Sequence, residues 1–125
     1  MNLSLSAFSD LVKEVLEELT AAMDDELRNQ AAEVLVYSAD VPEGKAGCLD
    51  RLGLLGLYEG VPRPERTVFA SIPRPPDSIT VFRRAHLRIC SDRAELRAEI
   101  RATLIHEFGH YFGFSEQELA DRGLS

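Results

Sequence analysis

The stretch HEFGHYFGFSE, from His106 to Glu116, decides what the C-terminal part of this chain can be. It holds two of the three histidines, four residues apart, with a glutamate directly after the first. Residues four apart lie on one face of a helix, so His106 and His110 can both offer a ring nitrogen to one metal ion. Glu107 is rotated by about 100° from His106, which keeps it out of that pair but lets it reach a water molecule at the metal. The spacing therefore indicates two metal ligands and one general base.

A long helix is predicted to carry this stretch. Ser91 is a suitable N-cap, and Asp92 and Glu95 follow in the first turn, where the helix dipole favours acidic side chains. The helix is expected to end at Gly113, because glycine readily takes the left-handed conformation of a helix C-terminus. Apolar side chains at four-residue steps predict its buried row: Leu96, Ile100, Leu104 and Phe108.

The residues after Gly113 suggest a third ligand. The break lets the chain turn back, so that Glu116 follows His106 by ten residues and can close a three-ligand zinc site with one open position. An acid at a helix start is also favoured by the dipole alone, which gives Glu116 a structural alternative. Asp121 and His86 are competing third ligands, and His86 is expected to be a surface histidine.

The glutamate two residues after Glu116 has a different interpretation. Ser115 and Glu118 match the Ser-x-x-Glu pattern of a capping box, in which the two side chains bond each other's backbone amides. Glu118 is therefore expected to cap the last short helix and not to bind metal.

The rest of the chain predicts a mixture of helices and short strands. The glycine-punctuated stretch LGLLGLYEG, over residues 52–60, is expected to be a bent strand or a loop with a closely packed backbone. The other expected elements are an amphipathic helix over 5–19, a helical turn over 23–29, strands over 33–37 and 78–82, and extended pieces over 67–70 and 87–89. A length of 125 residues predicts a single domain over residues 1–125.

Composition narrows the partners and the compartment. With 21 acidic and 14 basic side chains the net charge is -7, which disfavours nucleic acid as a partner. Cys48 and Cys90 are too few for a disulfide framework and predict free thiols in a reducing compartment. The N-terminus lacks a basic start followed by a long apolar run, so neither a secretory signal nor a membrane span is expected. The cytoplasm is the predicted location.

Three protein ligands on zinc predict hydrolytic chemistry. Such a zinc ion lowers the pKa of bound water to roughly 7 and polarises a carbonyl oxygen. Glu107 would take a proton from the attacking water and give it to the departing amine. The predicted reaction is hydrolysis of a peptide or related amide bond. Tyr111, Tyr58 and Arg83 are candidate oxyanion groups, and the sequence does not select among them.

Three stretches of the chain resemble the small bacterial zincin-like metallopeptidases, also called minimal metalloprotease-like proteins. They are LLGLYEG over 54–60, PDSITVFRR over 76–84 and TLIHEFGHYFGFSEQEL over 103–119. The last stretch is the specific one. The first two strengthen the resemblance because they lie outside the metal motif.

The resemblance implies an α+β fold with a small mixed sheet of three to four strands, packed on helices, with the H-E-x-x-H helix near the C-terminus. It implies zinc ligands at His106 and His110, a catalytic glutamate at Glu107 and an acidic third ligand, which Glu116 fits. Metzincins instead place a histidine or aspartate at the third position and have a downstream methionine turn. No methionine follows Met23 here. The resemblance implies a peptide or protein substrate without naming it.

Two other functions compete with a peptidase. A metal-dependent endoribonuclease can use the same ligand spacing, but such enzymes lack a glutamate after the first histidine and keep a third histidine. The acidic charge also weighs against RNA. The second alternative is a non-catalytic zincin-like module that binds metal or a peptide, with the proline-rich 61–76 loop and the GLYEG stretch as its partner surface.

Overall fold

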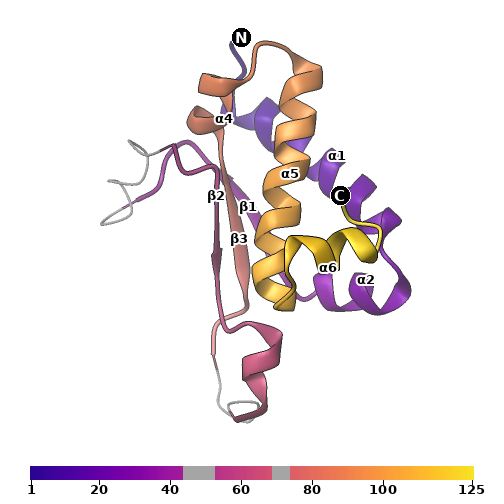
Figure 1. The fold of residues 1–125 in the computed structure, drawn as a ribbon. Coiled ribbons are helices and arrows are strands. Elements are labelled where there is room, and N and C mark those ends of the chain that lie inside the picture. Colours follow the sequence, from indigo (N-terminus) through magenta and orange to yellow (C-terminus); the bar gives the residue numbers. More distant parts are fainter. Residues whose placement is uncertain (44–52, 69–73) are drawn as a thin grey trace.

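The computed structural model describes residues 1–43, 53–68 and 74–125 (Figure 1). The helices in these residues are α1 (Leu5–Ala22), α2 (Asp25–Ala31), α4 (Arg83–Ile89), α5 (Arg93–Phe112), α6 (Glu116–Asp121) and a 3-10 helix, η2 (Arg63–Val68). The strands are β1 (Leu35–Ala39), β2 (Gly56–Glu59) and β3 (Ser78–Phe82). The expected α+β class, with a small mixed sheet and the histidine motif on a C-terminal helix, is therefore confirmed.

The sheet has the order β1-β3-β2, so β2 lies at one edge. β1 runs parallel to β3, and β2 runs antiparallel to it. The Phe82 amide donates to the Leu55 carbonyl at 2.9 Å, which sets the register of β2 on β3. Because bonded and non-bonded pairs alternate along an antiparallel ladder, the amides of Gly56 and Tyr58 face away from β3.

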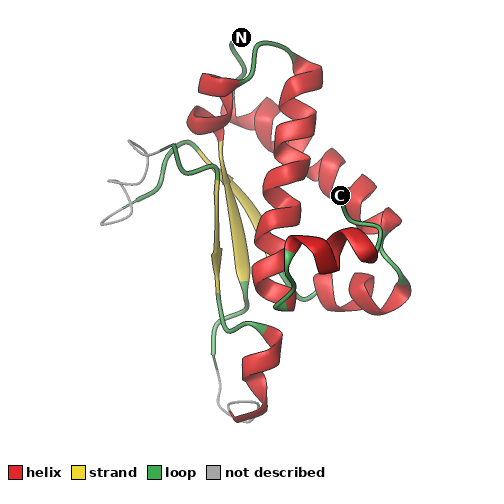
Figure 2. Cartoon of the chain, viewed as in Figure 1, coloured by secondary structure: helices red, strands yellow, loops and turns green. Residues whose placement is uncertain are grey.

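Helices α1, α2, α5 and α6 lie on one side of the sheet, whereas α4 and η2 lie beyond its two ends (Figure 2). α1 and α5 pack against each other, α1 contacts β1, and α5 contacts both β2 and β3. Burial of their apolar stripes removes hydrocarbon surface from water and supplies the main stabilisation of the fold. The predicted row of α5 is fully buried, as expected: Leu96, Ile100, Leu104 and Phe108.

The observed ends of α5 agree only in part with the ends predicted from the sequence. Its N-cap is Asp92, whose Oδ1 accepts a hydrogen bond from the Glu95 amide at 2.8 Å, so the predicted Ser91 cap is wrong by one residue. Aspartate and serine are comparable caps, and the sequence alone could not rank them. Gly113 ends the helix with φ 74°, as predicted. Ser115 and Glu118 form the expected capping box of α6.

Several other boundaries differ from the predicted ones. The predicted strand over 33–37 lies at 35–39, and the extended piece expected over 87–89 is wrong, because these residues belong to helix α4. A short apolar run does not distinguish a strand from a buried helical turn. Of the extended piece expected over 67–70, residues 67 and 68 belong to η2, and residues 69 and 70 lie outside the described residues.

Two further expectations concern cysteine and the membrane. Cys90 is a free thiol, as predicted, and it is buried, whereas Cys48 lies outside the described residues. Burial raises the pKa of the Cys90 thiol, which keeps it protonated. Among the described residues, no helix combines the length and the apolar character needed to cross a bilayer.

Candidate metal centre

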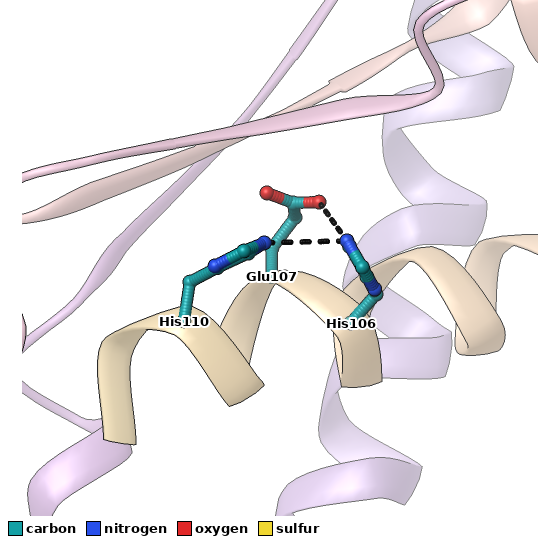
Figure 3. A group of neighbouring side chains, drawn as sticks. All are labelled: His106, Glu107 and His110. Carbon is teal, nitrogen blue, oxygen red and sulfur yellow. Dashed lines mark hydrogen bonds and ion pairs between the residues drawn. The ribbon is translucent and has the colours of Figure 1, made fainter. Parts of the chain in front are cut away.

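The two histidines of α5 point at one another. The Nε2 atoms of His106 and His110 lie 3.2 Å apart, and their rings stand nearly at right angles. Figure 3 shows both rings rising from successive turns of α5, with the Glu107 carboxylate beside them on the side of the strands. Both histidines are exposed, so an ion in solution can reach them. The predicted pairing of the two side chains is therefore present in the structure.

The spacing of these nitrogens fits zinc. Two nitrogens that each lie about 2.0–2.1 Å from one tetrahedral zinc ion are separated by roughly 3.3 Å. The observed separation of His106 Nε2 and His110 Nε2 is 3.2 Å. Neutral imidazole nitrogens are also common zinc ligands. The pair therefore presents two ligand atoms that need no backbone movement to share an ion.

Glu107 lies beside the pair but is held differently. Its Oε1 accepts a hydrogen bond from the Tyr58 amide at 3.0 Å, and its Oε2 lies 3.9 Å from His106 Nε2. Glu107 is buried, with 7% of its surface exposed. The ligand atoms of His106, Glu107 and His110 all lie within 4.8 Å of one another. One carboxylate oxygen is thus anchored on strand β2, and the other faces the histidines, a position from which a carboxylate can act as a general base.

A hydrogen-bond network around the buried carboxylate of Asp77 holds the strand that anchors Glu107. The Tyr58 hydroxyl donates to Asp77, which has 3% of its surface exposed and pairs with the guanidinium groups of Arg66 and Arg74. Burial, together with the Asp77 carboxylate, raises the pKa of Tyr58 far above its usual range. Tyr58 therefore holds its proton and serves to position Glu107 through the backbone.

The other two candidate oxyanion groups also have partners away from the histidines. The buried Tyr111 hydroxyl donates to the Gln30 carbonyl at 2.8 Å. Arg83 donates to the Asp40 carboxylate at 2.5 Å and to the Leu3 carbonyl at 2.8 Å. Together with the Tyr58–Asp77 bond, these contacts direct all three candidates elsewhere in this structure.

The predicted third ligand lies next to the pair, on its outer side. Glu116 Oε1 lies 3.7 Å from Nδ1 of His106, the ring nitrogen that faces away from His110. The Glu116 side chain is 87% exposed, so its three side-chain torsions are unconstrained by packing. Asp121, a competing third ligand, lies at the end of α6 and accepts a hydrogen bond from Gln117 at 2.9 Å.

His86, the other competing ligand, is buried and not at the surface as expected. Its Nδ1 lies 2.7 Å from the Phe82 carbonyl, and its Nε2 lies 3.0 Å from the Thr103 hydroxyl. Both ring nitrogens are thus engaged inside the protein. The sequence placed His86 near a strand end, but α4 turns it into the core, beside the ring of Phe8.

The buried position of His86 predicts a pH dependence of stability. Burial lowers the pKa of His86 below its ordinary value of 6.5, so the unfolded chain takes up the proton first as the pH falls. The contribution of neutral His86 to the unfolding free energy is therefore full above pH 6.5. It is lost as the pH falls through the lower pKa of His86 in the folded state.

Urea unfolding at about pH 8 and about pH 5, with chelator present, measures this loss. The wild type is expected to lose more unfolding free energy between the two pH values than His86→Gln. The exposed histidines of the site are present in both proteins, so any contribution they make cancels when the two losses are compared. An equal loss in the two proteins would show that His86 does not titrate on unfolding.

Gly56 brings β2 into close contact with the site helix. A Cβ at this position would lie 2.6 Å from Thr103 Cγ2 and 3.2 Å from Glu107 Cγ. Gly56→Ala is therefore expected to lower the unfolding free energy by about 1–3 kcal/mol. Thr103→Ser removes the methyl group that makes the closest contact and keeps the hydroxyl, so the double variant should recover part of that loss in urea unfolding. If Gly56→Ala has the same unfolding free energy as the wild type, the close packing of β2 against α5 is contradicted.

Two supporting features of the site were not assigned from the sequence. The Tyr58 amide that holds Glu107 is a backbone group and has no residue signature. The glycines of residues 53–60 did signal a closely packed backbone, and the structure places Gly56 against α5, where that signal applies. The link to Glu107 itself joins residues 49 positions apart and needs the fold.

Comparisons with known proteins agree with this geometry. A family model described as zincin-like metallopeptidase matches residues 31–124. The solved structure of a conserved hypothetical protein from Thermo thermophilus is similar, with a TM-score of 0.50 and 21% sequence identity over 95% of this chain and 99% of that chain. At this identity the likeness supports the fold alone. A search of curated proteins finds no match to the chain.

Proposed function

Because the chain belongs to the family of zincin-like metallopeptidases, we propose that it is a zinc-dependent peptidase with Glu107 as its general base. The observation that carries this proposal is that the two oxygens of the Glu107 carboxylate have different surroundings. Its Oε1 is held by the Tyr58 amide, and its Oε2 faces the paired histidine nitrogens. A glutamate with only a capping or surface role would not need a buried anchor on another strand.

His106 and His110 would hold the zinc ion through Nε2. We propose Glu116 as the third protein ligand, which leaves one position open for water or substrate. Glu116 begins α6, directly after the turn at Gly113, and its carboxylate already lies 3.7 Å from the His106 ring. Rotation of its exposed side chain would bring it from the Nδ1 side of His106 to the shared side. Two imidazole nitrogens and one carboxylate oxygen form a ligand set that zinc commonly accepts.

Zinc, when bound, supplies a polarised carbonyl and a water of lowered pKa. The chain's own contribution is proton transfer and orientation. Glu107 would accept a proton at Oε2 from the attacking water and return it to the departing amine. Its burial and its bond from Tyr58 keep the carboxylate in one position, so little reorganisation accompanies the transfer.

The position of β2 supports a peptide substrate. β2 is an edge strand, and its outward-facing backbone lies beside Glu107. The Tyr58 amide already donates to Glu107, so a peptide would pair with the other outward-facing groups of the strand, such as the Gly56 amide. An extended peptide can add to such an edge through main-chain hydrogen bonds, which recognise a peptide without regard to its sequence. The free, buried thiol of Cys90 is consistent with a reducing compartment, and we propose the cytoplasm as the location.

Digestion of a peptide library tests the proposed activity. Protein freed of metal by a chelator is expected to cleave peptide bonds after zinc is restored and to cleave none before that, with products identified by mass spectrometry. Absence of zinc-dependent products would remove the peptidase proposal and leave a metal- or peptide-binding module. Zinc-dependent cleavage of RNA in a parallel assay, without peptide cleavage, would instead favour the ribonuclease.

A further inference from the structure

A cavity of about 420 Å³ opens beside the proposed general base, and we call it the Glu99 pocket. One of its walls is the chain that leads into β2, and the opposite wall is α5. His106 and Glu107 lie on the pocket wall as well, so it adjoins the proposed site of hydrolysis. The pocket wall also includes Leu54, Leu55, Gly56, Glu99, Ala102 and Thr103.

The position of Glu99 along α5 gives the pocket a length. Glu99 precedes His106 by seven residues, which is two turns of helix, so the two side chains share one face about 10 Å apart. A short side chain entering beside the histidines would not reach the Glu99 carboxylate. The four-carbon stem of lysine, or the longer side chain of arginine, can bridge this separation.

The chemistry of the pocket also suits a long cationic side chain. Leu54, Leu55 and Ala102 provide an apolar wall against which an alkyl stem can lie. Glu99 is partly buried, and within the described part of the chain its carboxylate has neither an ion pair nor a hydrogen bond. Arg97, two residues earlier on α5, is already paired with Glu14 and Glu18 on α1. The charge of Glu99 is therefore left for a ligand.

We propose that the Glu99 pocket binds a lysine or arginine side chain next to the scissile bond, so that the substrates are basic peptides. This inference rests on the proposed peptidase function, because it places the pocket beside the reacting bond. The net charge of -7 would also attract cationic peptides to the protein from a distance. Glu99 would act as a specificity residue, with no part in the proton transfers.

Matched peptides test the cleavage preference. A peptide that the zinc-loaded wild type cleaves is prepared with lysine, arginine, methionine or glutamate in turn on either side of the scissile bond. A charge-assisted hydrogen bond to Glu99 predicts a preference for the basic peptides of roughly ten- to a hundredfold in kcat/KM. Glu99→Gln should abolish this preference, and Glu99→Lys should reverse it towards the glutamate peptide. Glu17→Gln, an exposed charge-matched variant on α1, should retain it.

The fold should tolerate Glu99→Gln, because Thr103 bonds the backbone carbonyl of residue 99 and not its side chain. Retention of the wild-type preference in Glu99→Gln would overturn the pocket assignment, even if the protein is an active peptidase. Equal cleavage of lysine and methionine peptides by the wild type would overturn it as well.

A binding measurement separates this proposal from the peptidase proposal. Fluorescence anisotropy is recorded for labelled lysine and methionine peptides with zinc-loaded Glu107→Gln and with Glu107→Gln/Glu99→Gln. Tighter binding of the lysine peptide, lost in the double variant, supports the pocket even if the wild type cleaves nothing. Absence of a lysine preference in binding contradicts the pocket, whatever the cleavage result.

Discussion

Glu107→Gln is expected to lower kcat/KM for peptide hydrolysis by about 10² to 10⁴-fold, the usual contribution of a general base. The amide cannot accept a proton at the position of Oε2, but its carbonyl oxygen can still accept the Tyr58 amide hydrogen bond that now anchors Oε1. Zinc affinity and unfolding free energy should therefore stay near their wild-type values. A loss in kcat with binding intact would place Glu107 in the reaction and not in the ligand set.

Initial rates on one cleavable peptide, with zinc content and urea unfolding measured on the same preparations, check this expectation. Glu17→Gln is a suitable control because it removes one exposed carboxylate, which lies on α1 and not on the helix that carries the site. Comparable rates for wild type and Glu107→Gln would exclude Glu107 as the base. Loss of bound zinc in Glu107→Gln would instead mean that this side chain coordinates the metal.

Asp77→Ala is expected to lower the unfolding free energy by about 2–4 kcal/mol. Asp77 is buried, and its carboxylate is the shared partner of Arg66, Arg74 and the Tyr58 hydroxyl. Its removal leaves two cations and one hydroxyl without that partner. The arginine side chains are 19% and 29% exposed, so solvent compensates in part, and the estimate stays below that for a fully buried charge.

Urea unfolding of Asp77→Ala and of Tyr58→Phe measures this network. Tyr58→Phe removes only one hydroxyl and should cost about 1 kcal/mol, with most of the network intact. Both variants should reduce peptidase activity as well, because Tyr58 positions Glu107 through its amide. A stability loss below about 1 kcal/mol in Asp77→Ala would mean that the network contributes little to the fold.

The C-terminal half of the site could be predicted because its information is local. Helical periodicity pairs His106 with His110, and the left-handed conformation of Gly113 needs only the preference of glycine. The capping box joins Ser115 and Glu118, which are three positions apart, and it was also predicted correctly. The resemblance to zincin-like metallopeptidases, which depends largely on this stretch, is confirmed by the family match over residues 31–124.

The remaining features required tertiary structure. The edge position of β2 follows from strand order, which no local pattern encodes, and it leaves the Tyr58 amide facing outward, where it meets Glu107. The burial of His86 depends on α4, whose short apolar run gave no clear helical period. Side-chain torsions, and not sequence spacing, determine on which side of the His106 ring the Glu116 carboxylate lies. For that reason the third ligand stays a prediction.

Zinc titration also addresses that third ligand. Glu116→Gln should weaken zinc binding, whereas Asp121→Asn should leave it unchanged if Asp121 serves only its hydrogen bond with Gln117. Replacement of a residue that only orients a ligand typically costs about 10–100-fold in metal affinity. A loss well beyond that range in Glu116→Gln would therefore indicate direct coordination. No loss would remove Glu116 from the site.

Calorimetric titration of metal-free protein with zinc tests the central claim most directly. Wild type and His86→Gln should each bind one zinc ion per chain, because His86 is buried and its ring nitrogens are engaged elsewhere. His106→Ala and His110→Ala should each lose more than about 100-fold in affinity. Binding of zinc by the wild type no more tightly than by His106→Ala would contradict the metal centre on α5.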